Sequence, residues 1–298
     1  MINITDDMRN DRQYTGTYEK FGATINKIPC VIKFPLSGSM NVYSEYIASN
    51  FIRKLGVYCQ EVHFGIYYGQ LVNVIVDFTA KDDSELHTLG DIIKSSKDDD
   101  SSVGDSDKDI EFYIDHYLKM PNIRKELAKQ QFWDMIICDA ILGNIDRHVG
   151  NLGYLSKNGQ HALAPLYDNG NIIFYGAYAI IDEYRNPLTR KELIHKCIHD
   201  EKKPFYNIKK PDGSVTNDYY EMFTGLSVDR PFAKAVRRFK SKFTWQNIFE
   251  VIHKVADKTY LPIDYINFCV EYVTIRYRCI ILRDDFDTAF NEVEELLW

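Results

Sequence analysis

Residues 144–151 read Asn-Ile-Asp-Arg-His-Val-Gly-Asn, which places an acid, two bases and two amides within eight residues. The stretch follows a helical pattern that ends at Leu142, and a further acid, Asp168, comes seventeen residues after Asn151. Carboxylate and amide oxygens are the ligands that a hard cation such as Mg²⁺ prefers. Another carboxylate nearby can orient or deprotonate an attacking hydroxyl. The stretch therefore predicts an active site; a polar loop between two structural segments is the alternative.

The spacing within this region is typical of a kinase catalytic loop. Asp146 precedes Asn151 by five residues, and Asp168 begins an Asp-x-Gly sequence of the kind that binds metal in kinases. In that arrangement Asp146 orients or deprotonates the substrate hydroxyl, and Asn151 and Asp168 are the candidate metal ligands. His148 is a second candidate for the base, or a residue that stabilises γ-phosphate charge, and spacing alone does not separate these roles. Arg147 is expected to pair with an acidic neighbour.

Composition is that of an ordinary folded protein. The 298 residues leave room for one large domain or two lobes, and the contents of hydrophobic (45%) and charged (27%) residues are usual. The net charge of −7 disfavours nucleic-acid binding through bulk charge. No apolar run approaches the roughly 18 residues that span a bilayer, and the N-terminus lacks a signal-peptide pattern. Six scattered cysteines without a Cys-x-x-Cys pair indicate reduced thiols and a cytoplasmic location.

Residues 1–80 are predicted to form a small β-rich lobe. Alternating and β-branched residues indicate a hairpin with a turn at Asn26-Lys27, followed by a helix whose apolar residues recur at helical spacing and two further strands. The expected ranges are 23–34 for the hairpin, 42–55 for the helix, and 62–67 and 70–78 for the later strands.

Residues 81–298 are predicted to form a larger, mostly helical lobe, joined to the first through a linker near residues 76–82. Helical patterns cover 110–118, 125–142, 244–257 and 262–298, and the last is expected to break near Arg283. The acidic, serine-rich stretch 95–109 cannot bury apolar surface and is expected to be a mobile surface insert. The fold class is therefore α+β, with a two-lobed, kinase-like outline.

Lys33 and Glu45 form a second candidate pair. Lys33 ends a β-branched strand, and Glu45 follows twelve residues later in the first turns of the predicted helix. Each has an ordinary interpretation, because a strand lysine usually faces solvent and a glutamate suits the start of a helix. Kinases use a strand lysine to hold nucleotide phosphates and a helix glutamate to hold that lysine. Beside the catalytic-loop pattern, the pair is expected to be functional.

Two further segments are candidates for nucleotide binding. Residues 15–20 read Thr-Gly-Thr-Tyr-Glu-Lys directly before the hairpin, where backbone N–H groups could cradle phosphate oxygens, although a simple turn is the alternative. Residues 76–78 end the last strand of the first lobe, where backbone groups could pair with an adenine edge. The candidate residues are Thr15, Gly16, Thr17, Lys20, Val76, Asp77 and Phe78.

The combined motifs resemble the HipA-like serine/threonine kinase family, and most strongly its compact branch. The likeness covers residues 14–170 and extends more loosely to the C-terminus. It is carried by the stretches 15–20, 31–35, 44–47, 132–135, 142–155 and 164–168.

This resemblance implies a two-lobed protein kinase that uses ATP and Mg²⁺ and acts on serine or threonine of a protein substrate. By analogy, Lys33 binds phosphate, residues 76–78 hold adenine, Asp146 is the base, and Asn151 and Asp168 bind Mg²⁺. Members of the family are often toxins neutralised by a small antitoxin protein. They can also autophosphorylate in the phosphate loop, which inactivates them.

The chain departs from the larger members of the family in two respects. No long N-terminal subdomain precedes the phosphate loop, and Gln13 stands where those members have a phosphorylated serine. Thr15 and Thr17 are the nearby substitutes for this serine, and Ser101 and Ser106 of the acidic insert are further candidates for autophosphorylation.

Two other functions are compatible with parts of the pattern. The catalytic stretch also resembles that of phosphoinositide kinases, so a lipid or small-molecule kinase is the first alternative, although the net charge disfavours a membrane partner. A catalytically inactive binding module is the second alternative. It is disfavoured by the joint presence of Lys33, Asp146, Asn151 and Asp168. A protein acceptor would need a groove beside Asp146, expected from residues 171–184. Export to a host cell is left open.

Overall fold

We describe a computed structural model of the chain. The residues that it describes are 1–14, 16, 18–37, 39–80, 83–96, 109–144, 146–172, 180–199, 206–210, 212–221, 230–259 and 261–297.

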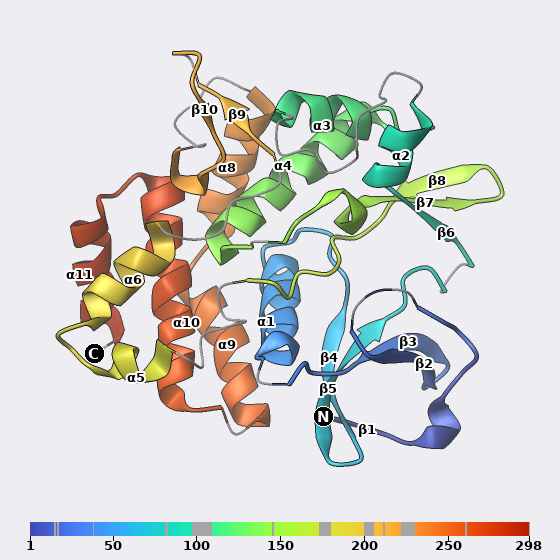
Figure 1. Cartoon of the computed structure of the whole chain (residues 1–298), viewed down its shortest axis with the longest axis horizontal. Coiled ribbons are helices and arrows are strands. Elements are labelled where there is room, and N and C mark those ends of the chain that lie inside the picture. Colours follow the sequence, from blue (N-terminus) through green and yellow to red (C-terminus); the bar gives the residue numbers. More distant parts are fainter. Residues whose placement is uncertain are drawn as a thin grey trace.

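The N-terminal part is a five-stranded mixed sheet in the order β1-β4-β5-β3-β2 (Figure 1). Strand β1 runs parallel to β4, and the other neighbours are antiparallel. Asn26 and Lys27, both with positive φ, form the β2–β3 turn where the sequence predicted it. Tyr68 and Gly69, also with positive φ, form the β4–β5 turn between the two expected strands. The strands are β1 (Ile2–Ile4), β2 (Lys20–Ile25), β3 (Ile28–Lys33), β4 (Val62–Tyr67) and β5 (Gln70–Val76).

Helix α1 (Asn41–Lys54) lies between this sheet and the helical part of the molecule (Figure 1). One side contacts β4 and β5, and another contacts α9 (Trp245–Lys258). The Asn41 side chain donates to the carbonyl of Phe34 at 3.3 Å and accepts from the N–H of Leu36 at 3.0 Å, so the chain turns directly from β3 into the helix. Gly56, with φ of +75°, stands directly after the expected helix range of 42–55 and suits the end of a helix.

The remainder is mostly helical, as expected. The predicted helices are present within one or two residues of their expected bounds, and a left-handed residue, Arg283 with φ of +70°, breaks the last pattern where the sequence predicted. The other helices are α2 (Leu89–Ser95), α3 (Ile110–Tyr117), α4 (Lys125–Leu142), α5 (Ile181–Arg185), α6 (Arg190–His199), α8 (Arg230–Lys242), α10 (Ile263–Arg276), a π-helical turn (Tyr277–Leu282) and α11 (Phe286–Leu297).

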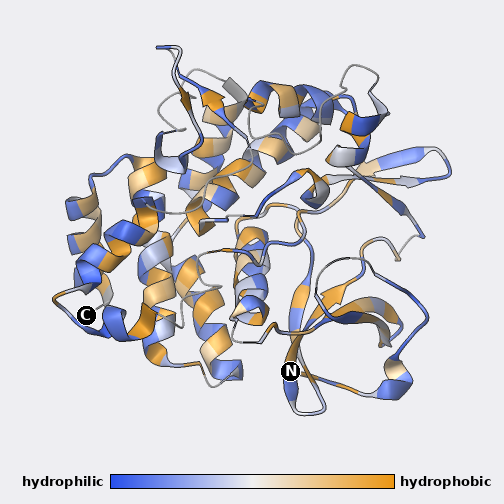
Figure 2. Cartoon of the chain, in the orientation of Figure 1, coloured by the Kyte–Doolittle hydropathy of each residue, from blue (hydrophilic) through white to orange (hydrophobic). Residues whose placement is uncertain are grey.

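A three-stranded antiparallel sheet in this part was not predicted. It consists of β6 (Glu85–Thr88), β7 (Gly153–Lys157) and β8 (Gln160–Leu163). Asn158 and Gly159, both with positive φ, form the β7–β8 turn, so this Asn-Gly pair was the missed hairpin signal. In Figure 2 this hairpin is mostly blue or pale, whereas β4 and β5 carry orange stretches. Two short strands, β9 (Ile208–Lys209) and β10 (Val215–Thr216), form a separate ladder.

The fold is α+β, with an N-terminal mixed sheet and a mostly helical remainder. Within the described ranges, no helix is both long and apolar enough to cross a membrane. Most of the acidic insert, residues 97–108 with Ser101 and Ser106, lies outside the described residues. The division into lobes at residues 80 and 81 stays a prediction.

Candidate active site

A cleft of about 520 Å³ lies between the five-stranded sheet and the catalytic stretch. All predicted site residues that the structure describes line this cleft. They are Gly16, Lys20, Lys33, Glu45, Val76, Asp77, Phe78, Asp146, His148, Asn151 and Asp168. Thr15 and Thr17 lie outside the described residues.

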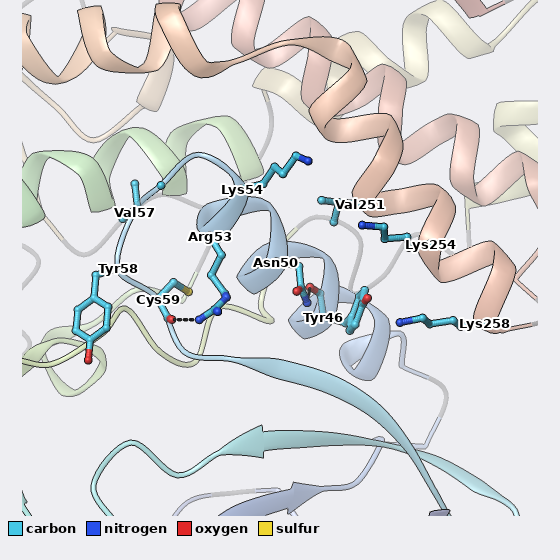
Figure 3. Close-up of a pocket in the computed structure, with 11 residues that line it drawn as sticks. Tyr46, Asn50, Arg53, Lys54, Val57, Tyr58, Cys59, Val251, Lys254 and Lys258 are labelled. Carbon is cyan, nitrogen blue, oxygen red and sulfur yellow. Dashed lines mark hydrogen bonds between the residues drawn. The ribbon is translucent and has the colours of Figure 1, made fainter. Parts of the chain in front are cut away.

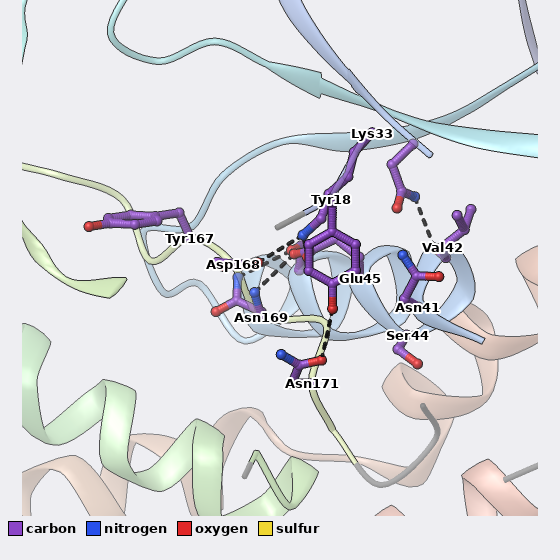
Figure 4. Close-up of polar contacts among 12 residues, drawn as sticks. Tyr18, Lys33, Asn41, Val42, Ser44, Glu45, Tyr167, Asp168, Asn169 and Asn171 are labelled. Carbon is purple, nitrogen blue, oxygen red and sulfur yellow. Dashed lines mark hydrogen bonds and ion pairs between the residues drawn. The ribbon is translucent and has the colours of Figure 1, made fainter. Parts of the chain in front are cut away.

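Lys33 sits between two carboxylates within this cleft (Figure 4). Its Nζ lies 3.2 Å from Oε2 of Glu45 and 2.8 Å from Oδ1 of Asp168. Burial alone would lower the pKa of Lys33, but the two carboxylates raise it above the usual value, so the amine stays charged. Burial alone would raise the pKa of Asp168, but the charge of Lys33 holds it below the usual value. The predicted pairing of Lys33 with Glu45 is therefore confirmed.

Glu45 is held by groups from three segments. Its Oε1 accepts hydrogen bonds from the Nε2 of Gln60 at 2.6 Å and from the backbone N–H of Asn169 at 2.9 Å. Ser49, one turn later on α1, donates to the same oxygen at 3.3 Å. The side chain is 1% exposed, so these bonds satisfy a carboxylate that has almost no contact with water. Oε2 is thereby directed to Lys33.

The backbone at Asp168 is shaped to reach this glutamate. Asp168 has φ of +53°, a left-handed conformation that aspartate tolerates better than most residues and that often marks a functional site. It aims the next N–H, that of Asn169, at Glu45. Gly170 then passes so close to α1 that an added Cβ would lie 2.8 Å from Oε2 of Glu45 and 3.2 Å from its Cβ.

Replacing Gly170 by alanine should therefore weaken both stability and activity. The added methyl group has to displace Glu45, and overpacking of this kind typically costs about 1–3 kcal/mol. We expect a lower melting temperature together with weaker ATP binding, because the displaced oxygen is the one that pairs with Lys33. Thermal melts and ATP titration measure the two effects.

Gly159→Ala is the matched control for this substitution. Gly159 also has little tolerance for a side chain, because its φ is +75°, but a Cβ there meets nothing within 4 Å. The control should lose about 1–2 kcal/mol from backbone strain alone, without any change in ATP affinity. Wild-type ATP affinity in Gly170→Ala would contradict the inferred packing role.

Arg147 connects the catalytic stretch to α4 and to the segment that contains Asp168. It pairs with Asp139 of α4, Nε to Oδ2 at 2.9 Å and Nη2 to Oδ1 at 3.0 Å, which identifies the acidic neighbour that the sequence left open. It also donates to the carbonyls of Asn151 and Tyr167, at 3.2 and 2.9 Å, and to Oδ1 of Asn169 at 2.6 Å. One buried guanidinium thus connects α4, the catalytic stretch and the segment containing Asp168.

Asp146 and Asn151 occupy different environments within the stretch. Asp146 is exposed, and its Oδ2 accepts a short hydrogen bond from Nδ2 of Asn171. Asn151 is buried, and its Nδ2 donates to the carbonyl of Asp146 at 3.1 Å. This bond leaves Oδ1 as the end of the amide that can bind a cation. Asn144 braces the same turn, because its Oδ1 accepts from the N–H of Asp146 at 3.0 Å.

His148 is also exposed, and one ring nitrogen is already used. Its Nδ1 accepts a hydrogen bond from the N–H of Gly150 at 3.0 Å. The backbone N–H can only donate, so the neutral ring carries its proton on Nε2. Neither nitrogen then has a lone pair available to take a proton from a substrate.

The end of β5 is partly committed to the sheet. The N–H of Val76 donates to Glu61 and that of Asp77 donates to Pro29, each at 2.9 Å. The backbone N–H groups of Val76 and Asp77 are therefore already used within the sheet. Of the three residues predicted to contact adenine, Phe78 has the next N–H along the chain. Its ring lies 5.6 Å from that of Tyr167, which gives this end of the cleft an aromatic wall.

Tyr18 links the predicted phosphate loop to Lys33 and to the segment that follows Asp168. Its ring lies over Nζ of Lys33, 4.3 Å from the ring centroid, and its hydroxyl donates to Oδ1 of Asn171 at 3.3 Å (Figure 4). Gly16, with φ of +116°, precedes it, and Nζ of Lys20 would lie 2.7 Å from a Cβ at that position. The Tyr18 ring therefore covers Nζ of Lys33 in this structure.

The family model of the HipA-like C-terminal domain matches residues 13–203, well over half of the chain. The chain belongs to the HipA-like C-terminal domain family. The match contains Lys33, Glu45, the catalytic stretch and Asp168, so the residues that carried the sequence resemblance all fall within it.

Two relatives illustrate the family. The serine/threonine-protein kinase CtkA of Helicobacter pylori (strain J99) is 28% identical over 263 residues, which cover 80% of this chain and 74% of CtkA. The crystal structure of a Helicobacter pylori proinflammatory kinase CtkA is similar with a TM-score of 0.81 and 24% identity, over 99% of this chain and 98% of the other. HipA of Shewanella oneidensis MR-1, in a toxin–antitoxin complex with HipB and operator DNA, has a TM-score of 0.55 and 13% identity, over 97% of this chain and 69% of the other.

Several residues of this HipA-like site were not identified from the sequence. Gln60 and Asn169 donate hydrogen bonds to Glu45. Asp139 pairs with Arg147, and Tyr167 lines the cleft. All of these contacts join segments that are distant in the sequence. No local spacing announces such contacts. The Asp-Asn-Gly run itself was visible, but the role of Asn169 depends on the approach of α1.

Proposed function

We propose that the chain is a protein serine/threonine kinase that uses ATP and Mg²⁺. The observation that carries this proposal is the double pairing of Lys33 with Glu45 and Asp168 in a cleft that Asp146 and Asn151 also line. Kinases need a charged lysine for nucleotide phosphates, a carboxylate for the hydroxyl and oxygen ligands for magnesium. The relative named as a serine/threonine-protein kinase supports the same class of acceptor.

The donor set fits a magnesium ion held jointly by protein and nucleotide. Asn151 and Asp168 supply hard oxygen ligands, and Mg²⁺ commonly takes only one or two protein ligands in addition to phosphates and water. When bound, the ion would neutralise charge on the phosphates and help to align them.

The protein residues divide the remaining tasks. Lys33, held by Glu45, would bind phosphate oxygens, and the apolar and aromatic wall near Phe78 would hold the adenine. Asp146 would accept the hydrogen bond of the acceptor hydroxyl and take its proton. We infer that Asp146 is the base in preference to His148, because the hydrogen bond from Gly150 leaves the neutral imidazole without an available lone pair.

Phosphate transfer to proteins tests the proposal directly. The purified chain is incubated with labelled ATP and Mg²⁺, with cell lysate in one sample and phosphoinositide vesicles in another. We expect phosphoserine or phosphothreonine in proteins, identified by mass spectrometry. Rapid labelling of lipid without labelled protein would establish the phosphoinositide-kinase alternative, and labelling of neither would indicate an inactive binding module.

ATP should stabilise the protein through Lys33. Nucleotide at about 100 times its Kd adds about 2.7 kcal/mol to the free energy of unfolding, which appears as a raised Tm. Lys33→Met should lose most of this ligand-dependent rise, because a neutral side chain cannot bind phosphate oxygens. The ligand-dependent rise is the quantity to compare, since the substitution also leaves Glu45 and Asp168 without their cation.

Lys27→Met, in the exposed β2–β3 turn, is the control for a lost lysine. It should show the full rise in Tm with ATP. Equal rises in Lys33→Met and Lys27→Met would place the nucleotide elsewhere.

Regulation, partners and location form a further part of the proposal. Autophosphorylation within the phosphate loop would place roughly −1.5 to −2 units of charge where ATP phosphates bind and would repel them. A small antitoxin is a proposed partner through the family, since the Shewanella HipA structure contains one. A cytoplasmic location is supported by the cysteines, because free thiols are present at Cys30, Cys59, Cys138, Cys269 and Cys279.

A further inference from the structure

A second hollow, of about 800 Å³, lies between α1, the loop that follows it and α9 (Figure 3). The α1 residues that line it include Tyr46, Asn50 and Lys54, spaced four residues apart on one helix face. Glu45 and Ser49, which belong to the catalytic site, do not line this hollow. We call this hollow the basic pocket.

Positive charge gathers in the basic pocket. Its lining contains Arg53, Lys54, Lys254 and Lys258 and, among the described residues, no aspartate or glutamate. A fifth cation is close, because Nζ of Lys242 would lie 2.7 Å from a Cβ added to Gly56. The whole chain carries a net charge of −7, so this concentration runs against the overall balance. Cations grouped in a concave surface raise the local concentration of anions.

Two of the four lining cations have acidic partners at the rim. Lys54 pairs with Glu250 at 2.6 Å, and Arg53 pairs with Glu61 at 3.4 Å. Neither Lys254 nor Lys258 has an ion pair with a residue that the structure describes.

The two lysines of α9 lie one turn apart near the C-terminal end of the helix, where the helix dipole favours cations. Lys254 and Lys258 stand four residues apart, a spacing at which like charges repel on a helix surface. Lys258 reaches back across the pocket to α1, where its Nζ lies 5.7 Å from the ring centroid of Tyr46. The acidic residue Asp257 precedes it on α9 but does not line the pocket. An anion between the two helices would relieve this repulsion.

One wall of the basic pocket belongs to the catalytic framework. Tyr58 and Cys59 line the pocket, and the carbonyl of Tyr58 accepts a hydrogen bond from the N–H of Leu166 at 2.9 Å. Gln60 donates from its backbone to Leu166 at 2.9 Å and from its side chain to Glu45 at 2.6 Å. Leu166 lies two residues before Asp168. A ligand that holds this wall therefore also holds the segments that carry Glu45 and Asp168.

We propose that the basic pocket binds a small organic molecule with two or more phosphate groups, and that its binding strengthens ATP binding. Cations from two helices suit a molecule that carries several separated negative charges. Tyr46, Val57 and Val251 offer contacts for the carbon skeleton. The binding step is independent of the proposed kinase activity, and only the effect on ATP rests on it.

Calorimetric titration with inorganic pyrophosphate, in the absence of divalent metal, tests the binding step. Lys254→Glu/Lys258→Glu should weaken pyrophosphate binding at least tenfold. The matched control is Lys234→Glu/Lys240→Glu, two exposed cations of α8 that do not line the pocket, with the same change in charge. This control should change the affinity less than twofold. Lys33→Met should retain binding, because the catalytic cleft is not the proposed site.

Three outcomes would overturn the binding proposal. One is equal affinity in the wild type and Lys254→Glu/Lys258→Glu, and another is loss of binding in Lys33→Met. The third arises if pyrophosphate does not bind, but anionic vesicles or a phosphopeptide capture the wild type and not the pocket variant, Lys254→Glu/Lys258→Glu. Each of these outcomes is a binding measurement that does not require kinase activity. A failure of the binding proposal can therefore be distinguished from a failure of the proposed kinase function.

Hydrogen exchange and kinetics test the coupling. Pyrophosphate should slow amide exchange over residues 50–60 in the wild type at least twofold and leave it unchanged in the pocket variant. A small organic bisphosphate should lower the KM for ATP of the wild type alone. Binding without either change would overturn the regulatory part of the inference.

Discussion

Replacing Asp146 by asparagine should lower the rate of phosphoryl transfer by roughly 10²- to 10⁴-fold, the usual cost of losing a general base. The amide cannot take the proton of the acceptor hydroxyl, although it keeps the shape of the carboxylate. The loss should appear in kcat with little change in the KM for ATP, because Asp146 is expected to contact the acceptor and not the nucleotide. Steady-state kinetics with a labelled protein substrate measure both quantities.

The fold should survive this substitution. Asp146 is exposed, and its carboxylate accepts a hydrogen bond from Asn171; no described residue forms an ion pair with it. The control for a lost surface carboxylate is Asp115→Asn, because Asp115 is also exposed but lies on α3. This variant should keep full activity. Wild-type kcat in Asp146→Asn would show that the base lies elsewhere, and His148→Gln would then be the next variant to measure.

Local patterns in the sequence were sufficient for much of this fold. Turn residues that tolerate positive φ placed both hairpins of the main sheet, and apolar spacing placed α1 and α4. These features depend on neighbours within a few residues, so a single sequence contains them. The β7–β8 hairpin was missed although its Asn-Gly turn is also local. Its flanking strands are short and partly polar, and a helical expectation for the whole region concealed them.

The candidate site divides in the same way. Asp146, Asn151 and Asp168 were identified because their order along the chain reflects the chemistry. The contacts that hold them come from distant segments. Gln60 reaches Glu45, and Arg147 reaches Asn169, only after α1, α4 and the catalytic stretch have packed together. Such support depends on tertiary structure, and no spacing rule for a single chain contains it.

The second large effect concerns the buried pair of Asp139 and Arg147. Asp139→Asn should destabilise the protein by about 3–5 kcal/mol, because it leaves a guanidinium uncompensated in the interior. Arg147 has a side-chain exposure of 0%, and Asp139 has 1%. Burial would by itself lower the pKa of Arg147, and Asp139 raises it above the usual value. A guanidinium is not deprotonated in proteins, so the charge stays when this partner is lost. At roughly 2–4 °C per kcal/mol for chains of similar size, Tm should fall by about 6 °C or more.

Kinase activity should fall together with stability in Asp139→Asn. A core residue without contacts to the candidate site would lower stability alone. Arg147 positions the carbonyls of Asn151 and Tyr167 and the amide of Asn169, so a displaced guanidinium loosens both segments that carry the proposed metal ligands. Lys191→Met breaks an exposed pair with Asp287 and is the control; its Tm should change by less than about 2 °C, as for most surface ion pairs. Thermal melts and kinetics well below Tm distinguish the two losses. If Asp139→Asn melts like Lys191→Met, the charge of Arg147 has found compensation elsewhere, and its carbonyl partners alone would then account for the organisation of the catalytic stretch.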